Sequence, residues 1–169
     1  MSKKQKASTM PKNWVLGSES VEHFAERYLA DDRLSLAREE MREKRLTLNS
    51  SELSYRIINH WESEGLISNL RPSGKGWRKY SVLDRVWIEV VAELRKFGCP
   101  IELIKRVKSR FEDGSETESA SSMPYLEIYT VITYYIKEPC YLLVFANGEA
   151  VLATPDVYTF SDDVGTIDN

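Results

Sequence analysis

The sequence predicts a mainly α-helical fold with small β elements, an α+β class, and three observations support this prediction. Apolar residues recur at helical spacing in several segments of the first two thirds of the chain. Turn residues separate short runs of strand length near 66–80 and 141–154. Hydrophobic residues make up 42% of the sequence, enough to bury a core, and the length of 169 residues suits one domain with an appendage or two small domains.

Charge is distributed unevenly along the chain. Residues 42–110 carry 15 Lys/Arg and 8 Asp/Glu, a net +7, whereas residues 111–169 carry one Lys and 11 Asp/Glu, a net −10. Residues 1–41 carry seven of each sign, so the three parts account for the total of −3. A basic middle followed by an acidic end predicts that the middle meets phosphate, with ordinary surface clustering as the alternative.

The N-terminal third contains two expected helices. Residues 1–13 are polar and expected to be disordered, and Ser18–Ser20 can cap a helix that runs to about Leu29. A second, highly charged helix is expected at Leu34–Leu46, either packed on the core or exposed as an arm. A break follows at 47–51.

A short helix follows this break. Asn49 and Glu52 have capping-box spacing, and the helix is expected to run through Trp61 and to stop near Gly65. Its apolar stripe comprises Leu53, Ile57, Ile58 and Trp61.

The next segment reads as a hairpin and a helix pair. Leu66–Tyr80 is expected to form strand, turn and strand, with Pro72, Gly74 and Gly76 in the turn. Ser81 caps a helix that ends at Gly98, Cys99 and Pro100. Ile101–Arg110 is the last helix of this group, with Ile104 and Val107 directed inward.

A change of composition marks the C-terminal part. Phe111–Met123 is small, polar and acidic, typical of a linker. Tyr125–Ile136 is expected to be a helix because Pro124 suits a first turn, although its Tyr and β-branched content favours a strand. The last dozen residues are acidic and expected to be loose.

Tyr141–Ala146 and Glu149–Thr154 flank Asn147-Gly148, which predicts a hairpin with a type I′ turn. That turn would pair Phe145 with Ala150, Val144 with Val151, and Leu143 with Leu152. Both faces of this hairpin are apolar, so it needs cover. Dimerisation or partner binding, a core within the same chain, and a small-molecule pocket are the alternatives.

Two groups of side chains are candidates for contacting a nucleic acid. The short helix carries polar, planar or cationic residues away from its apolar stripe, as a helix in a major groove would, although a solvated face explains them equally well. These residues are Tyr55, Arg56, Asn59 and His60. The hairpin gathers cations with interleaved aromatic rings, and such density favours a bound anion over a loop that only aids solubility. These residues are Arg71, Lys75, Trp77, Arg78, Lys79 and Tyr80, and Trp77 or Tyr80 is expected to face the core instead.

The order LSYRIINHWESEGLI, RPSGKGWRKYS and VLDRVWIEVVAELRKFGCPIELIKRV resembles the winged-helix domain of the MerR-type transcriptional regulators. The resemblance implies DNA binding through the short helix and the wing, usually as a dimer, with Arg56, Arg71, Trp77, Arg78 and Tyr80 touching DNA. Three positions depart from the family pattern: Asn59 replaces its second helix arginine, His60 its first tyrosine, and Glu52 the glycine of the turn. The family's long dimerisation helix and its metal-sensing cysteines have no counterpart.

These observations predict four parts: an N-terminal arm with helices (1–46), a MerR-like winged helix-turn-helix domain (47–110), a linker (111–123), and a C-terminal helix and β-hairpin module with an acidic tail (124–169). We expect a sequence-specific DNA-binding transcriptional regulator that contacts double-stranded DNA. An excisionase-like architectural factor of a mobile element is one alternative, and a module that binds an acidic protein or RNA is another.

Other classes are less consistent with the residues. Cys99 and Cys140 are far apart and lie in no Cys-x-x-Cys motif, so neither a disulfide framework nor a zinc site is expected. His23 and His60 fall in no nucleophile or metal spacing, and an enzyme is not expected. The chain shows no signal sequence or membrane span, which predicts a cytoplasmic protein, and no cofactor is expected.

Overall fold

The computed structural model describes residues 15–16, 23, 27–28, 30–31, 34–48, 53–68, 77–112, 123–137 and 139–154. The expectations for residues 1–13, the capping pair Asn49 and Glu52, the turn at 72–76, the interior of the linker and the acidic tail lie outside these residues. Within them the chain forms five α-helices and a small sheet, as the α+β class predicted.

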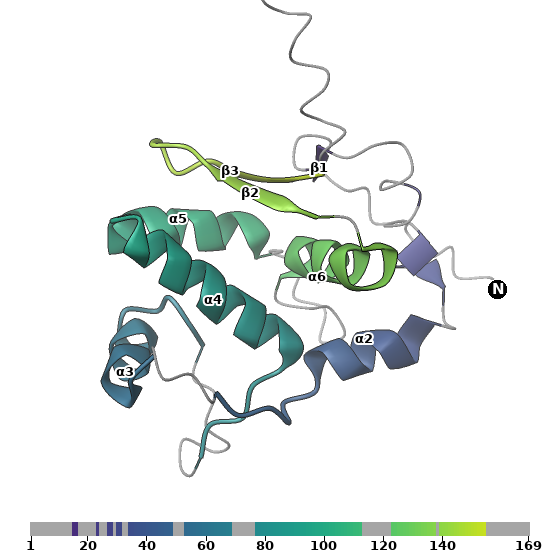
Figure 1. The fold of residues 1–169 in the computed structure, drawn as a ribbon, viewed down its shortest axis with the longest axis horizontal. Coiled ribbons are helices and arrows are strands. Elements are labelled where there is room, and N and C mark those ends of the chain that lie inside the picture. Colours follow the sequence, from purple (N-terminus) through teal and green to yellow (C-terminus); the bar gives the residue numbers. More distant parts are fainter. Residues whose placement is uncertain are drawn as a thin grey trace, which may run out of the picture.

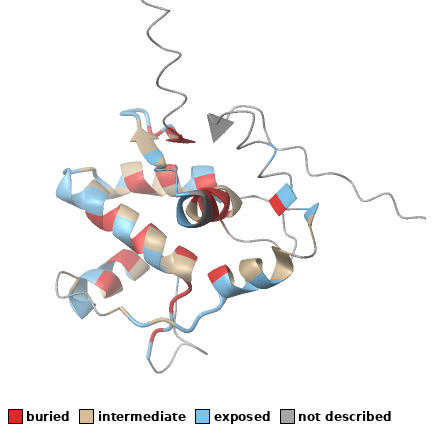
Figure 2. Cartoon of the chain, turned by 45° about the vertical axis from the view of Figure 1, so that its right-hand side comes forward, coloured by how far each residue is buried: buried red, intermediate tan, exposed pale blue. Residues whose placement is uncertain are grey.

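Helix α4 (Val82–Lys96) lies centrally, with α3 (Tyr55–Ser63) on one side and α5 (Ile101–Phe111), α6 (Pro124–Val131) and the sheet on the other (Figure 1). One hydrophobic core runs through all of these elements, as the buried residues of Figure 2 show. The C-terminal helix and hairpin therefore share a core with the basic middle of the chain, which was one of the alternatives for covering the hairpin.

Local hydrogen bonds start and end α4 as the sequence predicted. The Ser81 side chain accepts from the Asp84 backbone N–H at 3.0 Å, and the Asp84 carboxylate accepts from the Ser81 N–H at 2.8 Å, which completes a capping box. Gly98, at φ +81°, ends the helix, and the Cys99 N–H donates back to the Leu94 carbonyl at 2.9 Å. This pattern is a Schellman motif, which needs a residue in the left-handed region.

Helix α2 (Ser35–Arg42) is shorter than the expected Leu34–Leu46 and packs on the core through Met41. After it, the chain extends so that the Leu46 backbone exchanges two hydrogen bonds of 2.9 Å with Tyr80. The expected pairing of two strands within Leu66–Tyr80 is not present among the described residues of that segment. Its second arm pairs instead with the chain that precedes α3.

Two corrections concern α3. Its N-cap is Ser54, not Asn49, because the Ser54 hydroxyl accepts from the Ile57 N–H at 3.4 Å. Ile57 is exposed rather than part of the buried stripe, which consists of Ile58 and Trp61. The expected end at Gly65 is confirmed: its φ is +74°, and the Leu66 N–H donates to the Trp61 carbonyl at 2.9 Å.

The ends of the expected linker belong to the core. Phe111 is the last residue of α5, and its ring meets Trp87 edge-on with centroids 6.3 Å apart. Met123 is buried directly before α6, which starts at Pro124 as expected. The predicted helix at Tyr125–Ile136 is confirmed, and its second half, η3 (Ile132–Ile136), is a π-helix that ends at Lys137 with φ +64°.

The sheet contains three short strands in the order β1-β3-β2. Strands β2 (Tyr141–Val144) and β3 (Ala150–Ala153) form the expected hairpin, and β1 (Val15–Leu16) pairs in parallel with β3, which the sequence did not indicate. Figure 1 shows the hairpin over α5 and α6.

The predicted hairpin register was wrong by one residue. Val144 pairs with Ala150 and Leu143 with Val151. The Gly148 N–H donates to the Phe145 carbonyl, and Gly148, at φ +88°, is the residue of the turn in the left-handed region. This is a type I turn followed by a glycine bulge, with one more loop residue than the type I′ turn. Because both hairpin faces are apolar, hydrophobic pattern could not select the register.

Candidate nucleic-acid interface

Helix α3 presents the predicted contact residues on the side away from the core. Tyr55, Arg56 and His60 are exposed, and Asn59 is half-buried. The helix is nine residues long, and its opposite side packs through Ile58 and Trp61. The sequence therefore predicted the outward position of Tyr55, Arg56 and His60 correctly, whereas Ile57 was wrongly assigned to the buried stripe.

Arg78 is the unexpected member of the predicted site. Its side chain is only 7% exposed and lies against α3. One guanidinium nitrogen donates to the Glu62 carboxylate at 2.5 Å and to Asn59 Oδ1. The guanidinium also lies over the Tyr55 ring, 4.7 Å from its centroid. Positions 55, 59 and 62 form one row along the helix, so Arg78 contacts two successive turns of α3.

The charge of Arg78 is stabilised where it lies. Burial disfavours the cation, but the hydrogen bond and the negative charge of Glu62 outweigh this effect, and Tyr55 contributes further. The pKa of Arg78 is consequently raised above its ordinary value. The Arg78–Glu62 ion pair is therefore largely buried and not exposed to solvent.

Residues 77–80, which we call the wing base, alternate between exposed and buried side chains, as the residues of a strand do. Trp77 is 87% exposed and Lys79 is exposed, whereas Arg78 and Tyr80 are buried, Tyr80 at 4% exposure. The expectation that one of the two aromatic residues would face the core is confirmed, and that residue is Tyr80. Burial also raises the pKa of Tyr80, against an opposing effect of Arg78. Trp77 and Lys79 thus project from the wing base, while Arg71 and Lys75 lie outside the described residues.

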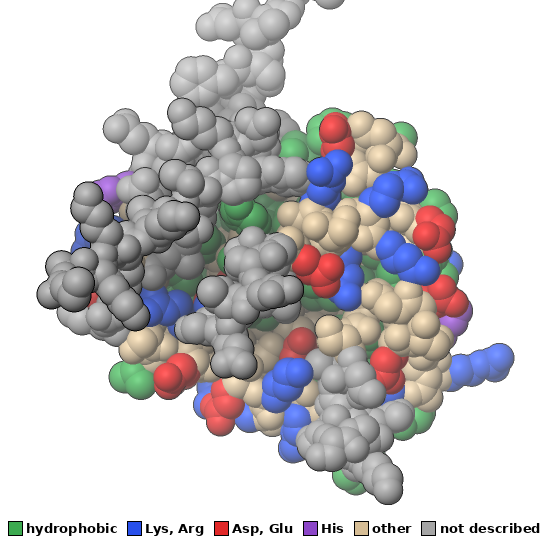
Figure 3. Space-filling view, turned by 180° about the vertical axis from the view of Figure 1, so that it is seen from behind, with side chains coloured by type: hydrophobic (Ala, Val, Ile, Leu, Met, Phe, Trp, Pro, Cys, Tyr) green, Lys and Arg blue, Asp and Glu red, His purple; other side chains and the backbone are tan. Residues whose placement is uncertain are grey.

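Two lysines of α5 hold the C-terminal end of α3. Lys108 donates to the Gly65 carbonyl at 2.9 Å, and Lys105 pairs with Glu64 at 3.3 Å. The indole of Trp87 donates to the Leu66 carbonyl at 2.7 Å. Some of the lysines in the basic segment 42–110 therefore stabilise the position of α3 and are not directed at a ligand. Figure 3 shows that acidic and basic side chains alternate over the described part of the rear face.

A comparison with protein-family models matches residues 49–110 to the MerR HTH family regulatory protein. Residues 49–110 are a MerR HTH family regulatory domain. The match covers α3, the wing base, α4 and all but the last residue of α5. The MerR domain implies a role in DNA-binding transcriptional regulation, and regulatory domains of this kind are typically non-catalytic.

The searches of curated proteins and of solved structures returned no match to the chain. Across the described ranges, no group of three or more His, Cys, Asp or Glu side chains is placed to hold a metal ion. The helices of those same ranges include none with the length and apolar character needed to cross a bilayer.

Sequence reasoning missed one residue that organises this interface and one that joins α6 to α2 elsewhere in the fold. Glu62 is one, and its signal was its place in the row with Tyr55 and Asn59 on the helix face. Glu127 is the other, the single carboxylate in the apolar run PYLEIYTV, where a charged residue implies a buried partner.

Proposed function

We propose that the MerR domain binds double-stranded DNA sequence-specifically, with α3 in the major groove and the wing against the backbone. The observation that carries this proposal is the contact of Arg78 with Tyr55, Asn59 and Glu62. It joins the wing base to α3, so both elements reach the duplex as one rigid surface.

Each exposed residue has a distinct role in this proposal. Arg56 contacts a guanine edge or a phosphate from α3, and His60 lies one turn further along the same helix. Lys79 neutralises a phosphate, and Trp77 packs against the sugar-phosphate backbone. Arg71 and Lys75 are proposed to add phosphate contacts from the wing. Arg78 acts through α3 rather than as an outer cation.

A salt titration tests the phosphate contact. Lys79→Ala should weaken binding to all duplexes and lower the slope of log K against log salt by about 0.9. Lys96→Ala is the matched control, because Lys96 is exposed on the last turn of α4 and pairs with Glu93 at 2.8 Å. Equal slopes for both variants would remove the wing from the interface. If the wild-type protein shows no salt-dependent binding to duplex DNA, the module that binds an acidic protein or RNA is favoured instead.

A selection from random duplexes tests sequence reading. Arg56→Ala should lose the preference at one base pair, at a cost of about 1–3 kcal/mol against the best site. Arg110→Ala, an exposed cation on α5, is the control. If the wild-type protein selects no consensus, the reading of bases by α3 is refuted. Selected sites at mobile-element ends would instead support the architectural alternative.

We further propose that the protein is a cytoplasmic homodimer. An apolar groove of about 620 Å³ runs along α4 and reaches Leu142 of the C-terminal hairpin. It is lined by Leu46, Val82, Val86, Val90, Leu94, Phe97 and Leu142, with Arg85, Glu89 and Glu93 at its edge. Groove residues of both charge signs suit a second copy of the same face.

Sedimentation of matched variants tests the dimer. Phe97→Glu should give monomers, because Phe97 lies in the groove and is 82% exposed. Leu36→Glu makes the same change at an exposed residue of α2 that is not part of the groove, and should stay dimeric. A monomeric wild-type protein would refute the proposal.

A further inference from the structure

Asn59 is half-buried on the face of α3 that also carries Tyr55, and Arg78 lies beside it. An asparagine in a major groove ordinarily pairs with adenine, because its oxygen accepts from adenine N6 while its nitrogen donates to N7. That pairing requires both polar atoms to reach the base edge together. The position of the Asn59 oxygen therefore decides what this side chain can read.

The oxygen of Asn59 is held by Arg78. Arginine has only donors, so the atom of the Asn59 amide that faces the guanidinium must be Oδ1. Hydrogen bonds to a charged group are roughly twice as strong as neutral ones. Because Arg78 is buried, an oxygen directed at it points into the protein and away from a docked duplex.

Arg78 cannot easily turn away from this contact. Its guanidinium is also bound to the Glu62 carboxylate, and the Tyr55 ring lies beneath it. Leaving Asn59 would disturb a buried ion pair, which is costly when one partner is lost. The orientation of the Asn59 amide is thus set from the wing, 19 residues away.

We infer that Arg78 makes Asn59 a donor-only reader that prefers guanine over adenine. This inference rests on the proposed DNA binding by α3. Guanine offers two adjacent acceptors, N7 and O6, to the amide N–H groups. Adenine places its N6 donor beside N7, where it opposes a second donor, and cytosine offers a donor there. Arg78 is a positioning residue in this arrangement.

The first test identifies the base that Asn59 contacts. Duplexes are selected from a random pool by the full-length protein and by Asn59→Ala, and the position whose preference disappears is the contact. Guanine is expected there, and adenine would overturn the inference. Asn59→Asp keeps an acceptor for Arg78 but removes the donors, so it should bind the guanine duplex about tenfold more weakly. Unchanged affinity of Asn59→Asp would also overturn it.

The second test removes the contact between Arg78 and the Asn59 oxygen. The double variant Arg78→Met/Glu62→Leu replaces the buried pair with apolar residues, a change that proteins often tolerate. Preference at the Asn59 contact should then shift from guanine to adenine, with the other positions unchanged. A purely structural role of Arg78 predicts weaker binding with guanine retained, which refutes the inference. Glu62→Gln, which leaves Arg78 in place, is the control and should keep guanine.

These outcomes separate the inference from the proposed function. If the wild-type protein binds DNA in a salt-dependent manner but prefers adenine at the Asn59 contact, the inferred guanine preference is refuted. The proposed DNA binding is then unaffected. Failure of the wild type to bind any duplex refutes both. If the double variant does not fold, as judged by circular dichroism, the results for Asn59→Ala and Asn59→Asp still decide.

Discussion

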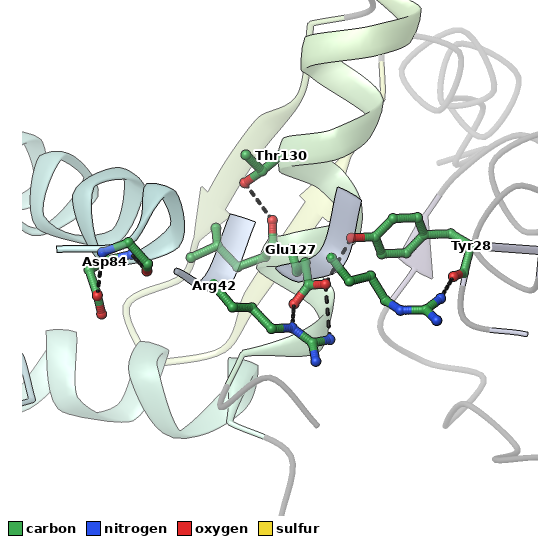
Figure 4. Close-up of polar contacts among 8 residues, drawn as sticks. Tyr28, Arg42, Asp84, Glu127 and Thr130 are labelled. Carbon is green, nitrogen blue, oxygen red and sulfur yellow. Dashed lines mark hydrogen bonds and ion pairs between the residues drawn. The ribbon is translucent and has the colours of Figure 1, made fainter. Parts of the chain in front are cut away.

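Glu127, a buried carboxylate of α6, accepts two hydrogen bonds from the Arg42 guanidinium of α2, with Oε2 2.8 Å from Nε and Oε1 3.0 Å from Nη2. The Tyr28 hydroxyl donates to the same carboxylate at 2.8 Å (Figure 4). The Glu127 carboxylate thus contacts Tyr28 and Arg42 of α2, which precede it by 99 and 85 residues in the sequence. This contact holds α2 against the C-terminal helix.

Removing Arg42 should destabilise the fold measurably. Glu127 is 1% exposed and would keep an uncompensated charge, whereas Arg42 is 30% exposed, so Arg42→Ala should lower the free energy of unfolding by about 2 kcal/mol. Arg45→Ala, at an exposed pair with Glu43, should change it by less than about 0.5 kcal/mol. Urea unfolding measures both, and equal effects would contradict a structural role for the buried pair.

Tyr28 should make stability fall at alkaline pH. Burial first, and then the charge of Glu127 and the hydrogen bond to it, raise the pKa of Tyr28 above its ordinary value of 10.0. Above about pH 10 the unfolded chain releases this proton while the folded chain retains it, so the free energy of unfolding decreases as pH rises. Tyr28→Phe removes this contribution.

The comparison of the two proteins by urea unfolding between about pH 8 and pH 11 checks the sign. The wild type should be more stable than Tyr28→Phe by about 1 kcal/mol near neutral pH, and this margin should shrink above about pH 10. A margin that stays constant or grows would show that Tyr28 does not keep its proton in the fold.

Arg78 and Glu62 should show strong energetic coupling. Arg78→Ala leaves the largely buried Glu62 carboxylate without its cation, and should cost about 3 kcal/mol of unfolding free energy. Arg78→Lys should recover only part of this loss, because an ammonium cannot reproduce the planar contacts with Glu62, Asn59 and Tyr55.

A double-mutant cycle with Glu62→Ala isolates the pair, and a coupling energy of about 1–3 kcal/mol is expected. The exposed pair of Lys96 and Glu93 supplies a reference cycle, for which about 0.3–0.5 kcal/mol is expected. Similar coupling in both cycles would mean that Arg78 does not join the wing to α3.

Gly148 should tolerate alanine less well than Gly65. Both have positive φ, but a Cβ at Gly148 would lie 2.9 Å from the Arg106 Cβ, closer than real Cβ atoms approach, whereas one at Gly65 would have no atom within 4 Å. Gly65→Ala should cost about 1–2 kcal/mol from backbone conformation alone, and Gly148→Ala about 1–3 kcal/mol more from crowding. When Arg106 is also replaced by alanine, the additional loss of unfolding free energy at Gly148→Ala should become smaller. An unchanged additional loss would exclude crowding by Arg106 as its cause.

The parts of the fold that sequence reasoning predicted depend on neighbours in the chain. The cap at Ser81 and the glycine ends at Gly65 and Gly98 involve residues at most five positions apart. The outward face of α3 followed from helical periodicity for the same reason. The combined order of helix, basic wing and helix pair was enough to indicate the MerR domain, which the family comparison then matched.

The features that could not be predicted depend on contacts between distant segments. Asn-Gly is compatible with two turns, and both faces of the hairpin are apolar, so the residues near the turn could not decide between the two registers. Arg78 looked like one more wing cation because its partners precede it by 16 and 19 residues. Arg78 is buried because the fold places the Glu62 carboxylate and the Tyr55 ring beside it. The sequence around Arg78 does not show that these partners will be near.

The sequence by itself determined where α4 begins, where α3 and α4 end, and that Tyr55, Arg56 and His60 face outward, since short-range hydrogen bonds and periodicity suffice for these features. Only the tertiary structure decided that Arg78 turns inward to hold α3 and that Glu127 joins α2 to α6. Burial and ion pairing depend on which surfaces meet after the chain has collapsed.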